Sequence, residues 1–506
     1  MAELKNVEVG KYTLESLTTG MYSDPKIVYR EYIQNSVDSL EEAVRQGLIE
    51  PQSMRIDVLV NEEENKITIR DNGVGISSKI AVSTLLNIGN SKKRNSTNRG
   101  FRGIGRLGGM SYCEKLIFIT SSFGEKMKTI VSFDCNKLRK LLIPGEFENF
   151  NLNRVLEEIT TINLEKEDEG RHYFSVEMEG VDGLSDLLDL DVVKSYISQV
   201  APVTYSKKIF FHASELYGYF SNRGYDIEEF PIFVGDDYST LEPIYKPNRY
   251  RFESDRTKHK ADQIESIEYF DVEIDGELYA LGWYANTNWY GTICDSEIAG
   301  IRVRKGNILI GDSKTLNQVF KEPRFNGWAQ GELFIVTDKV IPNARRDDFE
   351  QNDAYYKLLN CLKNTIGTNL AKIAREASIK RNDTSTQVIK EVEDKVHEVK
   401  NLLTEGFNSA VEKEKVVNDL VETANKLTST KIREDLTEKK DELVSVIAQT
   451  RQIVSESNNY KINKVNSSID RKSKKILAVV SDILSEKLTK DVVDEIIDEI
   501  IATLNK

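Results

Sequence analysis

Apolar and polar positions alternate along several short segments in the first part of the chain. Residues 56–60 and 67–69 carry isoleucine or valine at every second position, which is the period of a half-buried strand. Similar segments predict further strands near residues 116–120, 129–133 and 172–178. We therefore predict a first domain of mixed α/β structure over residues 1–183.

A longer segment with the period of a helix precedes these strands. It should begin after Asp24-Pro25, because an N-cap residue followed by proline is typical of a helix start. It should end near Gln46, because Gly47 is a common C-terminal stop.

The region from 184 to 352 is again mixed and predicts a second α/β domain. Its short apolar runs predict strands at 209–211, 269–274, 301–303, 308–310 and 333–336. The predicted fold class is therefore α+β, with a third, helical region to follow.

That third region, residues 353–506, should be entirely helical. None of the nine prolines lies beyond Pro342, and each proline inside a helix would cost about 3 kcal/mol. Val392, Val396, Val399 and Leu403 step by four, three and four residues, as in a coiled-coil seam. A broader apolar stripe covers residues 492–504. Packing within the chain and association with a second chain both fit, and we favour association and hence a homodimer.

Composition narrows the class of protein. The net charge of -13 argues against a protein that mainly grips nucleic acid. The four cysteines are too few to staple the chain, which favours a reducing, cytoplasmic compartment. No segment reads as a signal peptide or a membrane span, so we expect no membrane partner. No histidine has a cysteine or histidine partner at ligand spacing, and we expect no zinc site.

Three polar residues share one face of the predicted helix. Glu31, Asn35 and Asp38 are spaced by four and three residues, which brings them onto one side. Such a stripe can simply face solvent. It can also bind, because an asparagine oxygen is a suitable Mg²⁺ ligand and a nearby glutamate can deprotonate water.

A second motif, Asp71-Asn72-Gly73-Val74-Gly75, directly follows a predicted strand. By itself this sequence is typical of a turn. In a binding site, the carboxylate at the strand end would accept a hydrogen bond from the amino group of a base. The two glycines would then let the ligand approach the backbone.

A third motif is a glycine-rich segment that also carries arginines, residues 98–109. Its backbone N–H groups and guanidinium groups could surround a phosphate. It has no Gly-Lys-Ser/Thr sequence and is therefore not a P-loop. The members we single out are Gly100, Arg102, Gly103, Gly105, Arg106 and Gly108.

The order and spacing of the three motifs resemble the GHKL ATPases, which include gyrase, the 90-kDa heat-shock chaperones, histidine kinases and MutL. The resemblance implies a domain that binds ATP and magnesium. It implies that Glu31 is the general base, that Asn35 is the Mg²⁺ ligand and that Asp38 supports the site. It also implies that Asp71 binds the adenine amino group, that Gly73 and Gly75 line the base, that residues 100–108 form a phosphate lid and that Ser91 and Lys92 meet the phosphates.

Within the superfamily the sequence resembles the heat-shock chaperones and the MORC ATPases. Residues 341–349 resemble the chaperone loop whose arginine reaches the γ-phosphate. The alignment favours Arg346, with Arg345 second, although two arginines beside two aspartates can also form surface ion pairs. One departure is Gly170-Arg171-His172, where the chaperones carry Gly-Thr.

The resemblance implies an ATP-driven conformational switch that acts on a protein client or partner. Bacterial relatives of this kind also serve in anti-phage defence. A MORC-, topoisomerase- or MutL-like ATPase subunit that acts on DNA is the alternative.

Overall fold

The computed structural model describes most of the chain as two compact units. The first unit is Met1–Ser378 and the second is Ile379–Lys506. The described residues are 9–17, 24–87, 105–182, 186–382, 384–407, 410–457, 459, 476–477, 480, 484 and 490–504. Sheets and helices are mixed in the first unit and the described part of the second is helical, so the predicted α+β class is confirmed.

An eight-stranded sheet carries the N-terminal motifs. Its strand order is β5-β4-β3-β6-β2-β1-β7-β8, and every neighbouring pair is antiparallel except β1 and β7. The strands are β1 (Ile56–Asn61), β2 (Lys66–Asp71), β3 (Lys115–Ser121), β4 (Met127–Asp134), β5 (Thr160–Lys166), β6 (Tyr173–Glu179), β7 (Ile232–Gly235) and β8 (Glu242–Pro243). The last two strands lie beyond residue 183 and yet extend this sheet.

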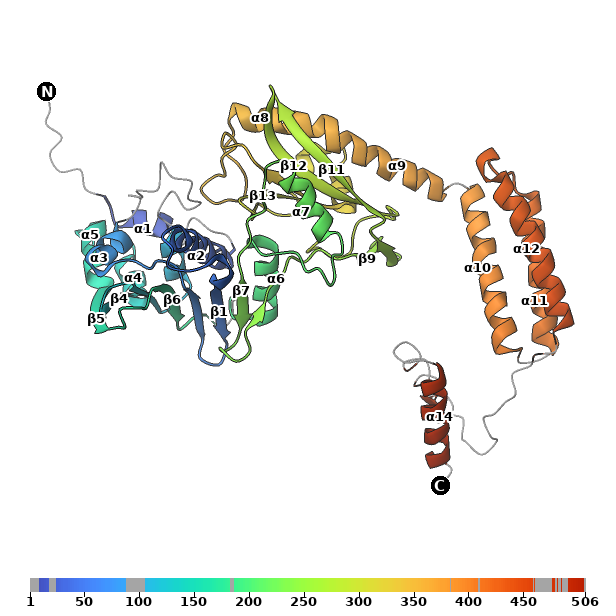
Figure 1. The fold of residues 1–506 in the computed structure, drawn as a ribbon, viewed down its shortest axis with the longest axis horizontal. Coiled ribbons are helices and arrows are strands. Elements are labelled where there is room, and N and C mark those ends of the chain that lie inside the picture. The colour runs from blue at the N-terminus through green and yellow to red at the C-terminus, as the bar shows by residue number, and fades with distance from the viewer. Residues whose placement is uncertain are drawn as a thin grey trace. The chain divides into compact units, whose positions relative to one another are not determined.

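One face of this sheet is covered by helices (Figure 1). Ile56, Val58 and Val60 alternate with less buried residues along β1, as the sequence pattern predicts. On α2, Val37 and Leu40 are fully buried in the same core. The helices of this region are α1 (Tyr12–Leu17), α2 (Ile27–Arg45), α3 (Ser78–Leu86), α4 (Cys135–Leu141), α5 (Leu152–Ile159) and α6 (Leu190–Val200).

The long helix begins slightly later than the sequence indicates. Its N-cap residue is Lys26 rather than Asp24, and the Lys26 side chain makes no capping hydrogen bond. The Asp24 carboxylate instead accepts a hydrogen bond from the Lys26 backbone N–H at 2.9 Å. The turn that contains Pro25 thus precedes the helix.

A five-stranded sheet with the order β11-β12-β15-β13-β14 forms the second core. Its strands are β11 (Ser266–Ile274), β12 (Glu277–Asn286), β13 (Gly300–Lys305), β14 (Ile308–Ile310) and β15 (Gln330–Ile335). Leu281 and Trp283 face the core that contains α7 (Ala213–Ser221), whereas Ala280 faces the core that contains α8 (Asp353–Leu362). Both faces of this sheet are therefore covered. Next to it lies a hairpin of β9 (Arg251–Ser254) and β10 (Lys260–Gln263).

The strand predicted at residues 209–211 is wrong, because the backbone forms a turn there. Phe210 is fully buried, while Ile209 and Phe211 are 48% and 62% exposed. A run of three apolar residues has too little periodicity to distinguish a strand from a turn that anchors one side chain.

The described α-helices of the C-terminal region are α9 (Thr368–Asn382), α10 (Thr384–Glu405), α11 (Ala410–Ser429), α12 (Thr437–Glu456) and α14 (Lys490–Leu504). The predicted seam lies on α10, and Val392, Val396 and Val399 are buried in one core with residues of α11 and α12. The seam therefore packs within its own chain, which corrects our preference for association at this site. Among the described residues, no helix is long and apolar enough to cross a membrane.

Candidate functional site

Helix α2 presents the predicted polar residues on a partly enclosed face. The Glu31 side chain is only 15% exposed, Asp38 is 4% exposed, and Asn35 is half-buried. A stripe that merely faced solvent would be exposed. The burial of these side chains therefore argues for a site rather than a solvated helix face.

The base of the predicted lid rests on α2. Its 3-10 helix Gly105–Ser111 begins next to Glu31, and a Cβ built on Gly105 would overlap the Oε2 atom of Glu31. The Tyr32 hydroxyl donates to the Arg106 carbonyl at 3.0 Å and accepts from the Gly109 N–H at 3.1 Å. Only glycine at position 105 allows this approach to the carboxylate.

Part of the predicted lid lies within this 3-10 helix and part lies outside the described residues. Gly108 is buried in the helix. Arg106 donates to the Asn87 carbonyl at 2.6 Å, and burial lowers the pKa of its guanidinium group. The members outside the described residues are Ser91, Lys92, Gly100, Arg102 and Gly103.

Asp71 ends strand β2 and points into the covered side of the sheet. It is 2% exposed, and its Oδ1 atom accepts a hydrogen bond from the Gly73 N–H at 2.9 Å. Burial raises the pKa of this carboxyl group to about 6, against the opposing effect of the Gly73 N–H and the Ser36 and Ser39 hydroxyls. Within the described part of the chain, its Oδ2 atom still lacks a hydrogen-bond partner.

The two glycines that follow Asp71 are required by packing within the protein. A Cβ on Gly73 would overlap the side chain of Ser39 on α2. Gly75 has a φ of +63°, and a Cβ there would overlap the Ser121 carbonyl oxygen. Both positions thus need glycine before any ligand is considered.

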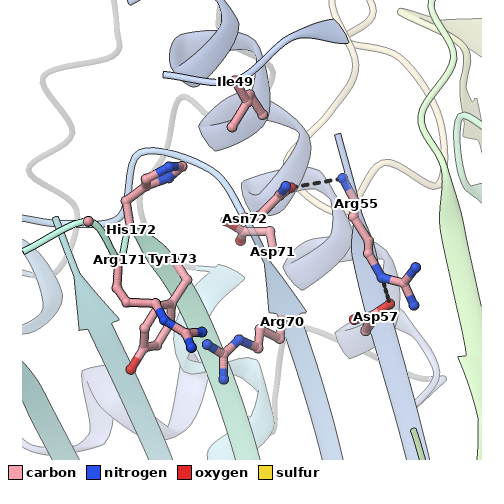
Figure 2. Close-up of a pocket in the computed structure, with 10 residues that line it drawn as sticks. Ile49, Arg55, Asp57, Arg70, Asp71, Asn72, Arg171, His172 and Tyr173 are labelled. Carbon is pink, nitrogen blue, oxygen red and sulfur yellow. Dashed lines mark hydrogen bonds and ion pairs between the residues drawn. The ribbon is translucent and has the colours of Figure 1, made fainter. Parts of the chain in front are cut away.

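A pocket of about 300 Å³ lies at the end of β2, beside the Asp71-Asn72 turn (Figure 2). Arg70, Arg171 and Tyr173 contribute to its wall, and the Arg70 guanidinium carbon lies 3.9 Å from the centre of the Tyr173 ring. Of the predicted site residues that the structure describes, Asp71 alone lines it. The pocket is therefore not the space in front of Glu31.

The segment that departs from the chaperone sequence contacts the turn after Asp71. The Nδ1 atom of His172 lies 2.8 Å from the Gly73 carbonyl oxygen, and Asp71 pairs with Phe174 across β2 and β6. Gly170, Arg171 and His172 therefore stand next to the Asp71 corner of the site.

The loop that contains Arg345 and Arg346 reaches α2 from more than 300 residues away along the chain. The Arg30 guanidinium donates to the Arg345 carbonyl at 2.6 Å and to the Arg346 carbonyl at 3.4 Å. The same guanidinium lies 3.8 Å from the Glu31 carboxylate. Arg30 thus holds this loop beside Glu31.

The two arginines of this loop differ in their surroundings. Arg345 is exposed, whereas Arg346 is 9% exposed and has a φ of +56°. The loop is closed by a bridge between Pro342 and Phe349 and by the hydrogen bond from the Arg346 N–H to the Asn343 carbonyl at 3.2 Å. The backbone of the loop is therefore defined without a ligand.

Several buried polar atoms around α2 have no hydrogen-bond partner within the described chain. They are Glu31 Oε1, both amide atoms of Gln34, Asp71 Oδ2, Arg30 Nε and Arg106 Nε. Each such atom costs about 1–3 kcal/mol when it stays unsatisfied, so their concentration at one place indicates a polar ligand. Carboxylate, amide and guanidinium groups together fit a nucleotide with its magnesium ion.

Two residues of this set, Arg30 and Gln34, were missed by the sequence analysis. Both belong to α2 and are 6% and 2% exposed. Both could have been found from the sequence, because they lie next to Glu31 on a predicted helix and polar residues are unusual at buried helical positions.

The comparisons with known proteins agree with this geometry. Residues 22–155 match the family described as histidine kinase-, DNA gyrase B- and HSP90-like ATPase. The chaperone protein HtpG of Acinetobacter baylyi is 33% identical over 78 residues, which are 14% of this chain and 12% of HtpG. HtpG of Wigglesworthia glossinidia brevipalpis is 28% identical over 144 residues, 24% of this chain and 22% of the relative. The chain thus spans less than a quarter of the length of either relative.

The matched residues include α2, β2 and the glycine-rich segment, and they form an ATPase domain of the GHKL class. Within that class, the domain resembles the Hsp90 chaperones.

Proposed function

We propose that this protein is an ATP-hydrolysing conformational switch of the Hsp90-like GHKL type. The observation that carries the proposal is the contact of Arg30 with both the Arg345–Arg346 backbone and Glu31. This contact joins a distant loop to the face that would hold the nucleotide. The same loop contacts the five-stranded sheet, because the N–H of Gly311, which follows β14, donates to the Arg346 carbonyl at 2.8 Å. A structural change at the phosphates would therefore be transmitted to that sheet.

We assign the nucleotide to the polar face of α2 and to Asp71, where Glu31 Oε1 and Asp71 Oδ2 lack a hydrogen-bond partner among the described residues, and we give Arg30 only a positioning role toward the loop of Arg345 and Arg346. Asp71 would accept a hydrogen bond from the adenine amino group, and Asn35 would bind Mg²⁺. Asp38, on the same face of α2 as Glu31 and Asn35, would support the site. Bound ATP would supply the reacting phosphoryl group, and bound Mg²⁺ would neutralise the negative charge of the phosphates. The residues assigned to line the base are Gly73 and Gly75, and those assigned to the phosphates are Ser91, Lys92, Gly100, Arg102, Gly103, Gly105, Arg106 and Gly108.

Glu31 is the proposed general base. Its Oε2 atom is covered by Gly105, whereas no residue that the structure describes forms a hydrogen bond with Oε1. We assign Oε1 to the attacking water. Arg346, with Arg345 as the second choice, would place its guanidinium group near the γ-phosphate.

We further propose that ATP brings two N-terminal domains together and that the switch acts on a protein partner or client, with anti-phage defence as one possible setting. The net charge of -13 supports a protein partner over DNA. A MORC-, topoisomerase- or MutL-like role on DNA is the alternative, and stimulation of ATP hydrolysis by DNA would favour it.

The test compares Glu31→Ala and Asn35→Ala with Glu42→Ala, a control on the same helix. Glu31→Ala should lower the hydrolysis rate by about 10²–10⁴-fold and leave ATP bound, because a general base contributes about that much. Asn35→Ala should instead lose the magnesium dependence of nucleotide binding. Wild-type hydrolysis rates in both variants would reject the assigned roles.

A further inference from the structure

Three potential metal ligands meet at the β9–β10 hairpin, outside the proposed nucleotide site. They are Glu253 on β9, His259 before β10, and Cys294, which follows in the chain after β12. The Nδ1 atom of His259 lies 3.1 Å from Oε2 of Glu253 and 3.9 Å from Sγ of Cys294. All three donor atoms lie within 4.8 Å of one another.

The backbone places Glu253 and Cys294 side by side. Ser254 and Ile293 form an antiparallel bridge, and the Cys294 N–H donates to the Glu253 carbonyl at 2.8 Å. Residues directly opposite each other on antiparallel segments project to the same face. The carboxylate and the thiol therefore share one side for reasons independent of any ligand.

The turn between β9 and β10 brings His259 to the same place. The His259 N–H donates to the Asp255 carbonyl at 2.7 Å, which closes the turn. His259 has a φ of +46° and Asp255 a φ of +63°, a conformation that costs energy for residues other than glycine. Two such residues in one five-residue turn indicate that its shape is specifically determined.

We propose that Glu253, His259 and Cys294 bind one zinc ion, with water in the fourth position. Zinc lies about 2.0–2.3 Å from oxygen, nitrogen and sulfur ligands in a tetrahedral site, so ligands that share an ion are separated by distances like those seen here. Imidazole and thiolate favour zinc over magnesium or calcium. Binding replaces the thiol proton by the metal and releases that proton to solvent.

An ion pair between His259 and Glu253 would account for the closeness of these two residues, but it gives no reason for the Cys294 thiol to lie beside them. Cys294 is half-buried, and its Sγ atom lies within 4.8 Å of a Glu253 carboxylate oxygen. A cation at this position would be attracted by that carboxylate. Ligand spacing along the sequence predicts no zinc site here, because His259 and Cys294 are 35 residues apart and only the fold brings them together.

The test uses the full chain, free of nucleotide and magnesium, and titrates it with Co²⁺ as a spectroscopic substitute for Zn²⁺. We expect one equivalent to bind, with a thiolate-to-cobalt charge-transfer band that Zn²⁺ abolishes by displacement. Cys294→Ser should remove the band. Cys361→Ser, which changes another half-buried thiol outside the cluster, should keep it.

Two further variants separate binding from misfolding. His259→Ala and Glu253→Gln should each weaken Zn²⁺ binding by more than about tenfold, and their unfolding temperatures without metal should match the wild type. Glu253 is exposed, so its variant should fold. The proposal is overturned if the wild type shows no charge-transfer band, or if Cys294→Ser binds Zn²⁺ as tightly as the wild type does.

Discussion

Asp71 is the residue whose protonation most directly connects structure and proposed function. Its burial raises the pKa of the carboxyl group to about 6. The ionised carboxylate is the form that would best accept a hydrogen bond from the adenine amino group. In the empty site the group is therefore mainly ionised at pH 7 and becomes mainly protonated below about pH 6. A ligand that donates a hydrogen bond to it would stabilise the charge.

We predict that ATP affinity falls by about tenfold in all as the pH drops from 7 to 5, because the ionised fraction of a carboxyl with a pKa of about 6 falls by that factor over this range. Calorimetric titration at several pH values measures this change. Asp71→Asn is the control: it should weaken binding at pH 7 by about tenfold or more, since a hydrogen bond to a charged group contributes about 1.5–3 kcal/mol, and its affinity should depend less on pH. Parallel pH profiles for the two proteins would remove Asp71 from the site.

The same pKa shift determines the sign of a stability effect. The folded carboxyl has a pKa of about 6 and the ordinary value is 3.8, so between these values the folded state holds more protons than the unfolded state. The free energy of unfolding without ligand should therefore contain a contribution from Asp71 that decreases as the pH rises from about 4 to about 6.

At the scale of elements, Arg30 links α2 to the loop of Arg345 and Arg346. Its guanidinium group is buried and donates to two carbonyls of that loop. Without these donors the loop would lose its fixed position beside Glu31. Misplacement of a catalytic group by about 1 Å can cost about 10²-fold in rate.

We predict that Arg30→Met lowers the rate of ATP hydrolysis by about 10²-fold and changes ATP affinity by less than about threefold. Steady-state hydrolysis and equilibrium binding measure the two effects separately. Arg45→Met is the matched control, because Arg45 lies on the same helix but is 61% exposed and pairs with Glu42. Equal rates for Arg30→Met and Arg45→Met would show that the loop does not depend on Arg30.

The sequence predicted those elements whose side chains alternate clearly. The alternation along β1 and the spacing on α2 follow from burial of one face, so both were found. The turn at Ile209–Phe211 escaped prediction because three apolar residues do not define a period. The contacts of Arg30 escaped it as well, since they join residues more than 300 positions apart, and no local pattern encodes such a pairing.

At the scale of the whole molecule, the C-terminal unit determines which surface remains for association with a second chain. The seam of α10 is covered by α11 and α12, so it gives no reason for a second chain. The stripe on α14 remains, where Val492 is 40% exposed and Ile496, Ile497 and Ile500 are half-buried. An apolar stripe with this exposure is a suitable association surface.

We predict that the chain is at least a dimer and that α14 contributes to the contact. A chain that ends after Ser378 should be a monomer that binds ATP but hydrolyses it more slowly, because dimerisation raises the effective concentration of the two ATPase domains. A chain that ends after residue 457 keeps the α10–α12 bundle and removes α14, so it should also be a monomer. Sedimentation of all three chains, with hydrolysis measured over a range of protein concentrations, tests both statements. If the chain that ends after residue 457 still dimerises, the contact lies elsewhere. If the full chain is monomeric with and without ATP, the dimer model is wrong.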